Sequence, residues 1–377
     1  MKKILIPTLI LALTVVSCKK KGCTDELAVN FDKKAQKDNG SCVYENVQTS
    51  YSIPSTYNFV DAAGNSTVDY SGQTDRLNQM REMATYIESG ETGVLNVQIL
   101  KDMFSNTNNP FSFTSTKQLK DKCFSLDQTL IESYLDSVAI ASQSFAQNAS
   151  AGQAGTLTSG TSEYLFSANG FDYDELIEKG IMGAVFMHQA LNEYFGSTKM
   201  NVDNTVAVDP ANGKYYTVMA HHWDEAFGYF AVPTDFPTTL GTDFWAEYCN
   251  KQNATLGSNA KMMDNFLKGR AAIVNNDYTN RDAAISTIRN TWEAISANQA
   301  ISYLNSAISY FGNDQAKYLH ILSEAYAFSW NLRYAPLETR KMSNVEHTAL
   351  MSLFGDNLWN LTLTDLNAIK AAITAKY

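Results

Sequence analysis

Apolar residues recur three and four positions apart along most of the chain from residue 71 onward. Leu77, Met80, Met83 and Ile87 show this spacing first, and Gly90 follows them. Such spacing places apolar side chains on one helix face, and glycine often ends a helix. Alternating strand patterns are almost absent, so the sequence predicts an all-α fold with about ten helices. The predicted helices cover residues 71–89, 95–104, 116–147, 174–195, 219–232, 259–276, 281–310, 314–334, 344–354 and 364–377.

Small and polar residues separate these helices. Residues 149–162 are rich in Gly, Ser, Thr and Ala, which predicts a mobile or surface loop. Residues 164–166 follow as a possible short strand. Residues 197–214 form a polar loop with two turn signals, Asp209-Pro210 and Asn212-Gly213.

Two of the predicted helices carry a histidine and a glutamate four residues apart. The first contains His221, His222 and Glu225, and the second contains His320 and Glu324. Side chains four residues apart lie on one helical face, one turn from each other. A single pair of this kind is usually a helix-surface pair that contributes about 0.2–0.5 kcal/mol. Two such pairs among aromatic residues are harder to explain in this way.

The two segments occupy equivalent places in an internal repeat. His221 aligns with His320 at an offset of 99 residues, and upstream Gln189-Ala190 aligns with Gln299-Ala300 at an offset of 110. The difference falls in the polar loop, where an insertion is easily accommodated. We therefore expect a duplicated helical bundle, with one all-α domain over residues 49–377. Its related helix pairs would cover residues from about 174 to 232 and from about 284 to 334.

Facing helices of this kind would bring two imidazoles and two carboxylates together in the bundle core. Helical bundles build metal sites in this way, and mixed nitrogen and oxygen ligands suit iron, zinc or manganese. The predicted ligands of a divalent metal ion, iron or zinc, are His221, His222, Glu225, His320 and Glu324. Neighbouring residues diverge by about 100° on a helix, so only one of the two adjacent histidines is expected to face the ion.

The N-terminus has the pattern of a bacterial lipoprotein signal. Lys2 and Lys3 precede an apolar run from Ile4 to Val16, and Ser17-Cys18 follows. The run is too short for a permanent membrane helix, which indicates a signal peptide over residues 1–17. Its end resembles a lipobox, which implies lipidation of Cys18 and anchoring of the chain to a membrane. We expect an outer-membrane lipoprotein of the cell envelope that faces the periplasm or the cell surface.

Residues 18–48 are expected to form a tether that contains a small cassette. Cys23 and Cys42 bracket a short polar segment that resembles a disulfide-looped cassette of secreted Bacteroidetes proteins, which implies that these two cysteines are bonded. So small a loop has no core of its own, and a crosslink would order it. The sequence does not show whether Cys123 and Cys249 are buried singly or are paired with each other.

Composition and motifs exclude several classes of function. The chain has a net charge of −10, and the body of the chain has no basic run, which argues against binding nucleic acid. A His-Glu-x-x-His motif is absent, which disfavours a standard zinc protease. Gly-x-Ser-x-Gly and Walker motifs are absent as well.

Two resemblances to known families come from these residues. Ala220-x-His222-x-x-Glu225 resembles the Gly-x-His-x-x-Glu motif of imelysin-like proteins, with alanine in place of glycine. That resemblance implies a duplicated all-α bundle and a role in iron uptake at the cell envelope. Residues 51–59, 68–72 and 221–237 are similar to a Bacteroidetes lipoprotein family catalogued as domain of unknown function 4856.

These observations together predict an envelope lipoprotein that binds a metal ion or a metal-bearing ligand without converting it. Envelope metal-uptake proteins would be its partners. One alternative is a metal-dependent hydrolase that uses Glu225 or Glu324 as a base. Another is a surface lipoprotein that binds a glycan or a protein and whose histidines are structural.

Overall fold

The computed structural model describes residues 20–24, 28, 30–38, 42 and 50–377. The chain forms two compact units, Met1–Ser50 and Tyr51–Tyr377. The first unit contains a short parallel pair of strands, β1 (Lys21–Gly22) and β2 (Lys37–Asp38), and a disulfide between Cys23 and Cys42. The predicted signal peptide and the predicted lipidation site, Cys18, lie outside the described residues.

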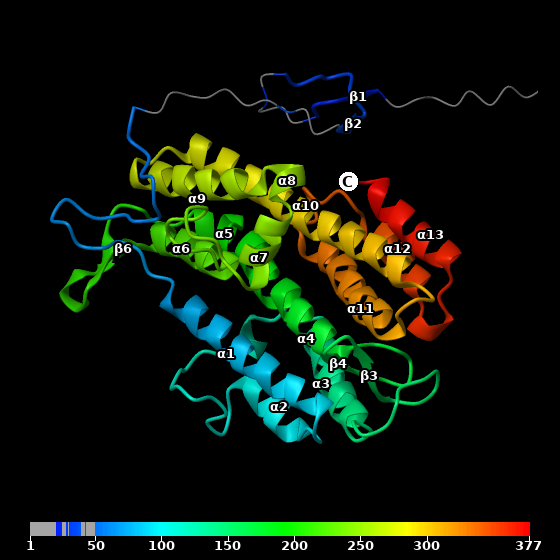
Figure 1. Cartoon of the computed structure of the whole chain (residues 1–377). Coiled ribbons are helices and arrows are strands. Elements are labelled where there is room, and N and C mark those ends of the chain that lie inside the picture. Colours follow the sequence, from blue (N-terminus) through cyan, green and yellow to red (C-terminus); the bar gives the residue numbers. More distant parts are fainter. Residues whose placement is uncertain (1–19, 25–27, 29, 39–41, 43–49) are drawn as a thin grey trace, which may run out of the picture. The chain divides into compact units, whose positions relative to one another are not determined.

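The second unit is all-α apart from two small hairpins, as the sequence predicts (Figure 1). Its described residues form thirteen α-helices, three more than expected because α5, α7 and α8 are short. The helices are α1 (Ser71–Glu88), α2 (Val97–Ser105), α3 (Gln128–Ser142), α4 (Tyr173–Ile181), α5 (Ser197–Met200), α6 (Val218–Phe230), α7 (Phe244–Lys251), α8 (Asn253–Leu256), α9 (Ser258–Val274), α10 (Tyr278–Tyr310), α11 (Gln315–Asn331), α12 (Asn344–Phe354) and α13 (Leu363–Thr374).

A long central helix organises this unit. It begins as α4 and continues without a break as two π-helical segments, η3 (Met182–Met187) and η4 (Gln189–Tyr194). The α4 part packs between α3 and α11, and the η4 part packs against α6. Helices α9 and α10 run side by side along the unit, and α10 also packs against α11 (Figure 1).

The π geometry of the central helix has an identifiable cause. Several of its carbonyl groups accept hydrogen bonds from outside the helix, so they are not restricted to the usual α-helical donors. Trp245 Nε1 donates to the carbonyl of Met182 at 2.8 Å, and Arg289 Nη2 donates to the carbonyl of Leu191 at 2.8 Å. Such insertions into the hydrogen-bond ladder are a common reason for irregular helices.

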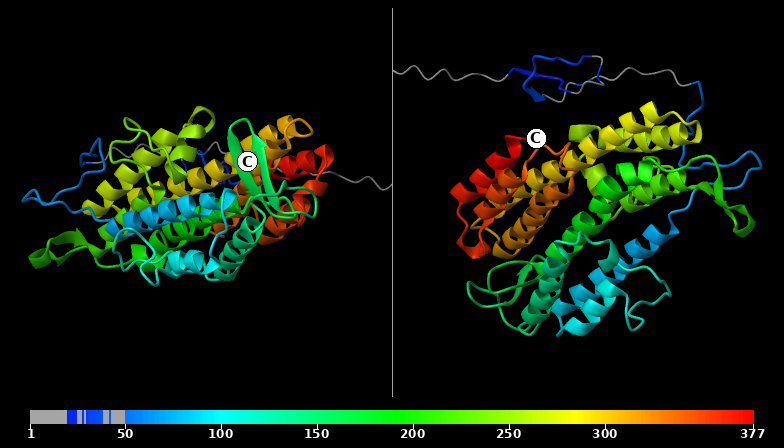
Figure 2. Two further views of the ribbon diagram at one scale, coloured as in Figure 1. Left: turned by 60° about the horizontal axis from the view of Figure 1, so that its bottom comes forward. Right: turned by 180° about the vertical axis from the view of Figure 1, so that it is seen from behind.

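Two antiparallel hairpins interrupt the helices. Strands β3 (Gly155–Ser159) and β4 (Ser162–Phe166) pair with Leu157 opposite Tyr164, and β5 (Ala207–Asp209) pairs with β6 (Lys214–Thr217). The second hairpin projects from the body of the unit in both views of Figure 2. The predicted loop over residues 149–162 is therefore wrong in part, because its second half pairs with the strand expected at 164–166.

One predicted helix is also wrong. Residues 116–147 were expected to form a single helix, but a short 3-10 turn, η2 (Lys120–Lys122), precedes a bend and α3 begins only at Gln128. The cause is tertiary, because the backbone N–H of Phe124 donates to the carbonyl of Ala184 in the central helix at 2.8 Å. In contrast, the helix predicted over residues 281–310 is confirmed, since α10 runs without a break.

The core runs through the whole second unit, and α6 is its most buried short helix. Trp223, Ala226 and Phe227 of α6 are almost fully buried. Gly228 allows α1 to approach closely, since a Cβ atom there would lie 2.7 Å from the Cβ of Tyr70. Cys123 and Cys249 are both buried free thiols. Among the described residues, we find no helix with both the length and the apolar character needed to cross a membrane.

Candidate functional site

His320 of α11 and two carboxylates at the start of the central helix form the densest group of potential metal ligands. His320 Nδ1 lies 3.0 Å from Asp172 Oδ2 and 3.7 Å from Glu175 Oε1. Within the described part of the chain, this is the one group of three whose ligand atoms all lie within 4.8 Å of one another. All three side chains are largely buried but retain some contact with solvent.

Local structure fixes these side chains with respect to each other. Asp172 is the N-cap of α4, and its side chain accepts a hydrogen bond from the backbone N–H of Asp174 at 3.2 Å. The backbone N–H of Asp172 donates to Ser323 Oγ of α11 at 3.0 Å. Since His320 lies one turn before Ser323, α11 holds both the cap and the imidazole that faces it.

A buried lysine and further carboxylates surround this group. Lys179 Nζ lies 2.8 Å from Glu175 Oε2 and 3.1 Å from Glu178 Oε2. Glu324 Oε2 lies 3.8 Å from His320 Nε2, on the side of the ring opposite to Asp172. The group thus contains more carboxylates than cations in a setting of low solvent access, where charge is costly unless it is paired.

The pKa values reflect this crowding of charge. Burial raises the pKa of Glu324 to about 7, and the neighbouring Glu175 charge acts in the same direction. Burial lowers the pKa of His320, but the hydrogen bond to Asp172 and the charge of Glu175 outweigh burial, so the pKa lies above its ordinary value. Burial alone would raise the pKa of Glu175, yet Lys179 and His320 hold it below its usual range.

The β3–β4 hairpin and η1 (Ser89–Glu91) border the same group. The ring of Tyr164 in β4 stacks on His320, with centroids 4.2 Å apart and planes at 26°. Burial and the charge of Asp172 raise the pKa of Glu91 to about 7. Lys317 Nζ donates to the Tyr164 hydroxyl at 3.1 Å, so this side carries a cation as well as the Glu91 carboxyl group.

The first histidine segment lies elsewhere, in α6. His222 Nδ1 lies 3.0 Å from Glu225 Oε2, and His221 Nε2 lies 3.9 Å from Glu225 Oε1. Both rings therefore flank one carboxylate, which corrects the expectation that only one of them would face a given site. His221 Nδ1 donates to the carbonyl of Asp69 at 2.9 Å, and its ring stacks on Tyr216. The Asp69 carbonyl and the Tyr216 ring thus fix the orientation of the His221 side chain.

The expectation of one shared site for both histidine segments is wrong. Gln73 Nε2 donates to Glu225 Oε1 and to the hydroxyl of Tyr194, which places Glu225 at the last residue of the central helix. His320 instead lies at the start of the same helix, beside Glu175. Glu175 and Tyr194 are 19 positions apart in sequence, which corresponds to more than about 20 Å at a helical rise of roughly 1.5 Å per residue. His221, His222 and Glu225 therefore cannot share an ion with His320 and Glu324.

Asp224, between these residues in sequence, has a structural environment. Its Oδ1 accepts hydrogen bonds from Arg270 Nε at 2.8 Å and from the Tyr57 hydroxyl at 2.8 Å. Both members of the ion pair are almost completely shielded from solvent. This pair ties α6 to α9 and to the segment before α1, so we assign it to the stability of the fold.

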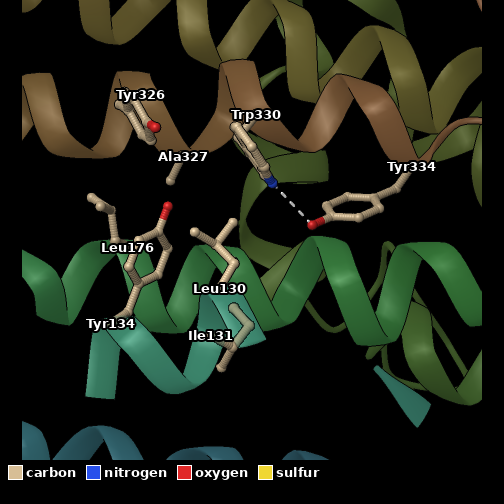
Figure 3. Close-up of a pocket in the computed structure, with 9 residues that line it drawn as sticks. Leu130, Ile131, Tyr134, Leu176, Tyr326, Ala327, Trp330 and Tyr334 are labelled. Carbon is tan, nitrogen blue, oxygen red and sulfur yellow. Dashed lines mark hydrogen bonds between the residues drawn. The ribbon is translucent and has the colours of Figure 1, made fainter. Parts of the chain in front are cut away.

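A narrow pocket lies between α3, α4 and α11, and Figure 3 shows its lining. Its lining consists of aromatic and aliphatic side chains. The small side chain of Ala327 leaves room for the helices to approach, and Trp330 Nε1 donates to the Tyr334 hydroxyl at 3.1 Å. No ionisable side chain other than tyrosine lines this pocket. This pocket therefore offers no charged group for catalysis or metal binding, in contrast to the His320 group.

Sequence reasoning did not identify Asp172, Glu175 or Lys179 as site residues. Asp172 and Glu175 are three residues apart at a predicted helix start, a spacing that places two carboxylates on one face. That spacing was the available signal. Their partner His320 is 148 residues away from Asp172, so no local pattern could have identified the group.

Comparison with known proteins gives a family. The model of the family described as "Domain of unknown function (DUF4856)" matches residues 54–377, which is nearly all of the second unit. No curated protein and no solved structure matches the chain.

Proposed function

For this chain, which belongs to the family described as a domain of unknown function (DUF4856), we propose that Asp172, Glu175 and His320 bind a divalent metal ion. The observation that carries the proposal is the spacing of the three ligand atoms. Two ligands about 2.1 Å from one ion, at angles near 90–110°, lie about 3.0–3.4 Å apart. The separations of His320 Nδ1 from the two carboxylates, 3.0 and 3.7 Å, need only a small adjustment to reach this range.

The donor set suits a borderline transition metal. One imidazole with two carboxylates favours zinc, iron or manganese over calcium, which prefers six to eight oxygen ligands. With Nδ1 directed at the ion, His320 Nε2 faces Glu324 at 3.8 Å. Metal-bound histidines commonly donate their second ring nitrogen to a carboxylate, which orients the ring. Glu324 therefore takes an orienting role, not the ligand role that its spacing from His320 predicted.

The cellular setting belongs to the same proposal. The lipoprotein pattern of residues 1–18 supports a lipid-anchored protein of the cell envelope. The resemblance of Ala220-x-His222-x-x-Glu225 to imelysin-like proteins supports a role in iron or metal acquisition. The motif that carries this resemblance lies in α6, whereas the proposed ligands lie in α4 and α11.

Metal analysis of purified variants tests the proposal. We expect about one zinc, iron or manganese ion per chain in the wild type and its loss in D172N and in H320A. H221A is the matched control, because His221 also belongs to a histidine–glutamate pair but lies in the other segment. E175Q adds a variant of similar shape in case H320A does not fold. An unchanged metal content in D172N and E175Q, or no metal in the wild type after loading with all three ions, would overturn the proposal.

A second candidate function has one observation in its favour. A carboxylate with a pKa of about 7, beside a metal-binding histidine, has the protonation behaviour of a general base, and Glu324 meets that description. A metal-dependent hydrolase would then use Glu324 to activate water. Hydrolysis of p-nitrophenyl acetate and p-nitrophenyl phosphate by the metal-loaded protein, abolished in E324Q without loss of metal, would support it. Equal rates for E324Q and the wild type would exclude that role for Glu324.

A further inference from the structure

A second group of charged side chains surrounds Tyr194, at the other end of the central helix from His320. The ammonium groups of Lys122 and Lys199 both lie over the Tyr194 ring, each 5.8 Å from its centroid. Both lysines are half-buried. Within the described part of the chain, neither ammonium group forms an ion pair or a hydrogen bond to a protein atom. Two cations are therefore held next to one ring without a carboxylate partner.

A third cation adds to this excess of positive charge. Burial lowers the pKa of Lys122, and the charges of Arg76 and Lys199 act in the same direction, whereas the charges of Glu225 and Glu193 partly oppose them. The Arg76 guanidinium donates to backbone carbonyls, from Nε to Gln118 at 2.8 Å and from Nη1 to Gly72 at 3.1 Å. These carbonyls accept two of its five N–H groups but do not neutralise its charge.

The nearby carboxylates are already engaged. Glu225 accepts from Gln73 at 3.2 Å and contacts His222 at 3.0 Å, and Glu193 is half-exposed and lies 3.9 Å from His188. Positive charge that is partly withdrawn from water and unpaired favours the arrival of an anion. His222 adds a possible donor, since its Nδ1 faces Glu225, which leaves Nε2 for another partner, and its ring lies 6.0 Å from that of Tyr194.

We propose that Lys122 and Lys199 bind the phosphate or carboxylate group of a small anionic molecule next to Tyr194 and His222. Lysine ammonium groups act as point charges, so they accept either kind of oxyanion. His222 and Glu225 are each about one-sixth exposed, so solvent reaches this group. This site is separate from the metal ligands and does not rest on the proposed metal function.

Calorimetric titration of the full chain tests this site. Inorganic phosphate and malonate are the two probes, and chloride at matched ionic strength is the reference, because screening weakens such contacts. We expect at least one probe to bind the wild type and to bind K122A/K199A about tenfold more weakly. K122R/K199R keeps both charges and should keep the affinity of the wild type. K261A/K268A removes the same charge from two exposed lysines and should bind as the wild type does.

Each outcome of these titrations either supports or contradicts the proposed anion site. Binding of phosphate alone or of malonate alone identifies the oxyanion class and supports the site. No binding of either probe beyond chloride would overturn it, and so would equal weakening in K261A/K268A and K122A/K199A. The single variants K122Q and K199Q serve if the double variant does not fold, as judged by circular dichroism. H320A should bind the anion normally, so failure of the metal proposal would leave this result unaffected.

Discussion

The carboxylate of Asp224 and the guanidinium of Arg270 form an ion pair with a 2.8 Å contact, and neither side chain is more than 1% exposed. Arg270 also donates to the carbonyl of Thr67 at 2.7 Å, so the pair joins α6, α9 and the segment before α1. Removal of one member of a buried ion pair leaves the other charge unpaired in the interior. We therefore expect the loss of either side chain alone to destabilise the fold.

We expect D224N to lower the free energy of unfolding by about 3–5 kcal/mol, because Arg270 would stay buried without its counter-ion. Urea denaturation followed by circular dichroism measures the change. D264N is the matched control, since Asp264 is exposed on α9, the helix that carries Arg270, and should change stability by less than about 0.5 kcal/mol. Similar midpoints for D224N and D264N would contradict this assignment.

Gly228→Ala should destabilise the protein by about 1–3 kcal/mol, the usual cost of forcing extra volume into a packed core. The added Cβ would lie 2.7 Å from the Cβ of Tyr70 and 2.9 Å from the Cβ of Gln73, neither of which can move without α1. G93A is the control, because the nearest atom to its Cβ would be 3.6 Å away. Chemical denaturation measures the free energy of unfolding of both variants. A G228A protein as stable as G93A would contradict the close packing of α1 against α6.

His347 should make stability fall as the pH falls from about 6.5 toward 4. Its Nε2 donates to the carbonyls of Ser329 and Trp330, and burial lowers its pKa to about 4. Between that value and the ordinary pKa near 6.5, the unfolded chain binds a proton that the folded chain does not, so stability increases with pH across this window.

The expected size is about 2 kcal/mol between pH 7 and pH 5. Other groups titrate in the same range, so the quantity to measure is the difference in unfolding free energy between the wild type and H347Q at each pH. That difference should shrink by the stated amount on acidification. A difference that does not vary with pH would show that His347 titrates normally in the folded protein.

Gly183→Ala should weaken metal binding as well as stability. A Cβ there would overlap the side-chain oxygen of Asn331 and lie 2.7 Å from Tyr334 Cδ2, so the central helix would be pushed away from α11. The proposed ligands lie on these two elements, and we expect about tenfold weaker zinc binding. G180A is the control, since its Cβ would meet only the flexible end of Ile131 at 3.1 Å. Unchanged zinc affinity in G183A would separate this packing contact from the site.

Local patterns in the sequence were sufficient for most helices. The apolar spacing that predicted residues 71–89 corresponds to α1, and residues 314–334 correspond to α11 and the turn after it. The bend before α3 was not predictable, because residues 116–127 keep a helical apolar spacing and the bend depends on a hydrogen bond to Ala184. A contact of this kind depends on residues far apart in sequence, which periodicity does not show.

The same limit applies to the candidate site. Spacing identified His320 and Glu324 as neighbours on one helical face, and the structure places them 3.8 Å apart. Spacing did not identify Asp172 and Glu175 as the carboxylates closest to His320 Nδ1. Their proximity results from the packing of the central helix against α11. The separation of the two histidine segments likewise depends on which ends of the central helix they contact.

The π turn at the end of the central helix bears on the ancestry of the two helix pairs. Tyr194 lies five residues after Gln189, one turn of the π-helical segment, whereas Tyr303 lies four residues after the aligned Gln299, one ordinary turn of α10. Each tyrosine interacts with the glutamate of its own pair, Tyr194 with Glu225 and Tyr303 with Glu324. If the predicted duplication holds, one residue was gained or lost after the copies separated, and the wide turn kept tyrosine and glutamate in register.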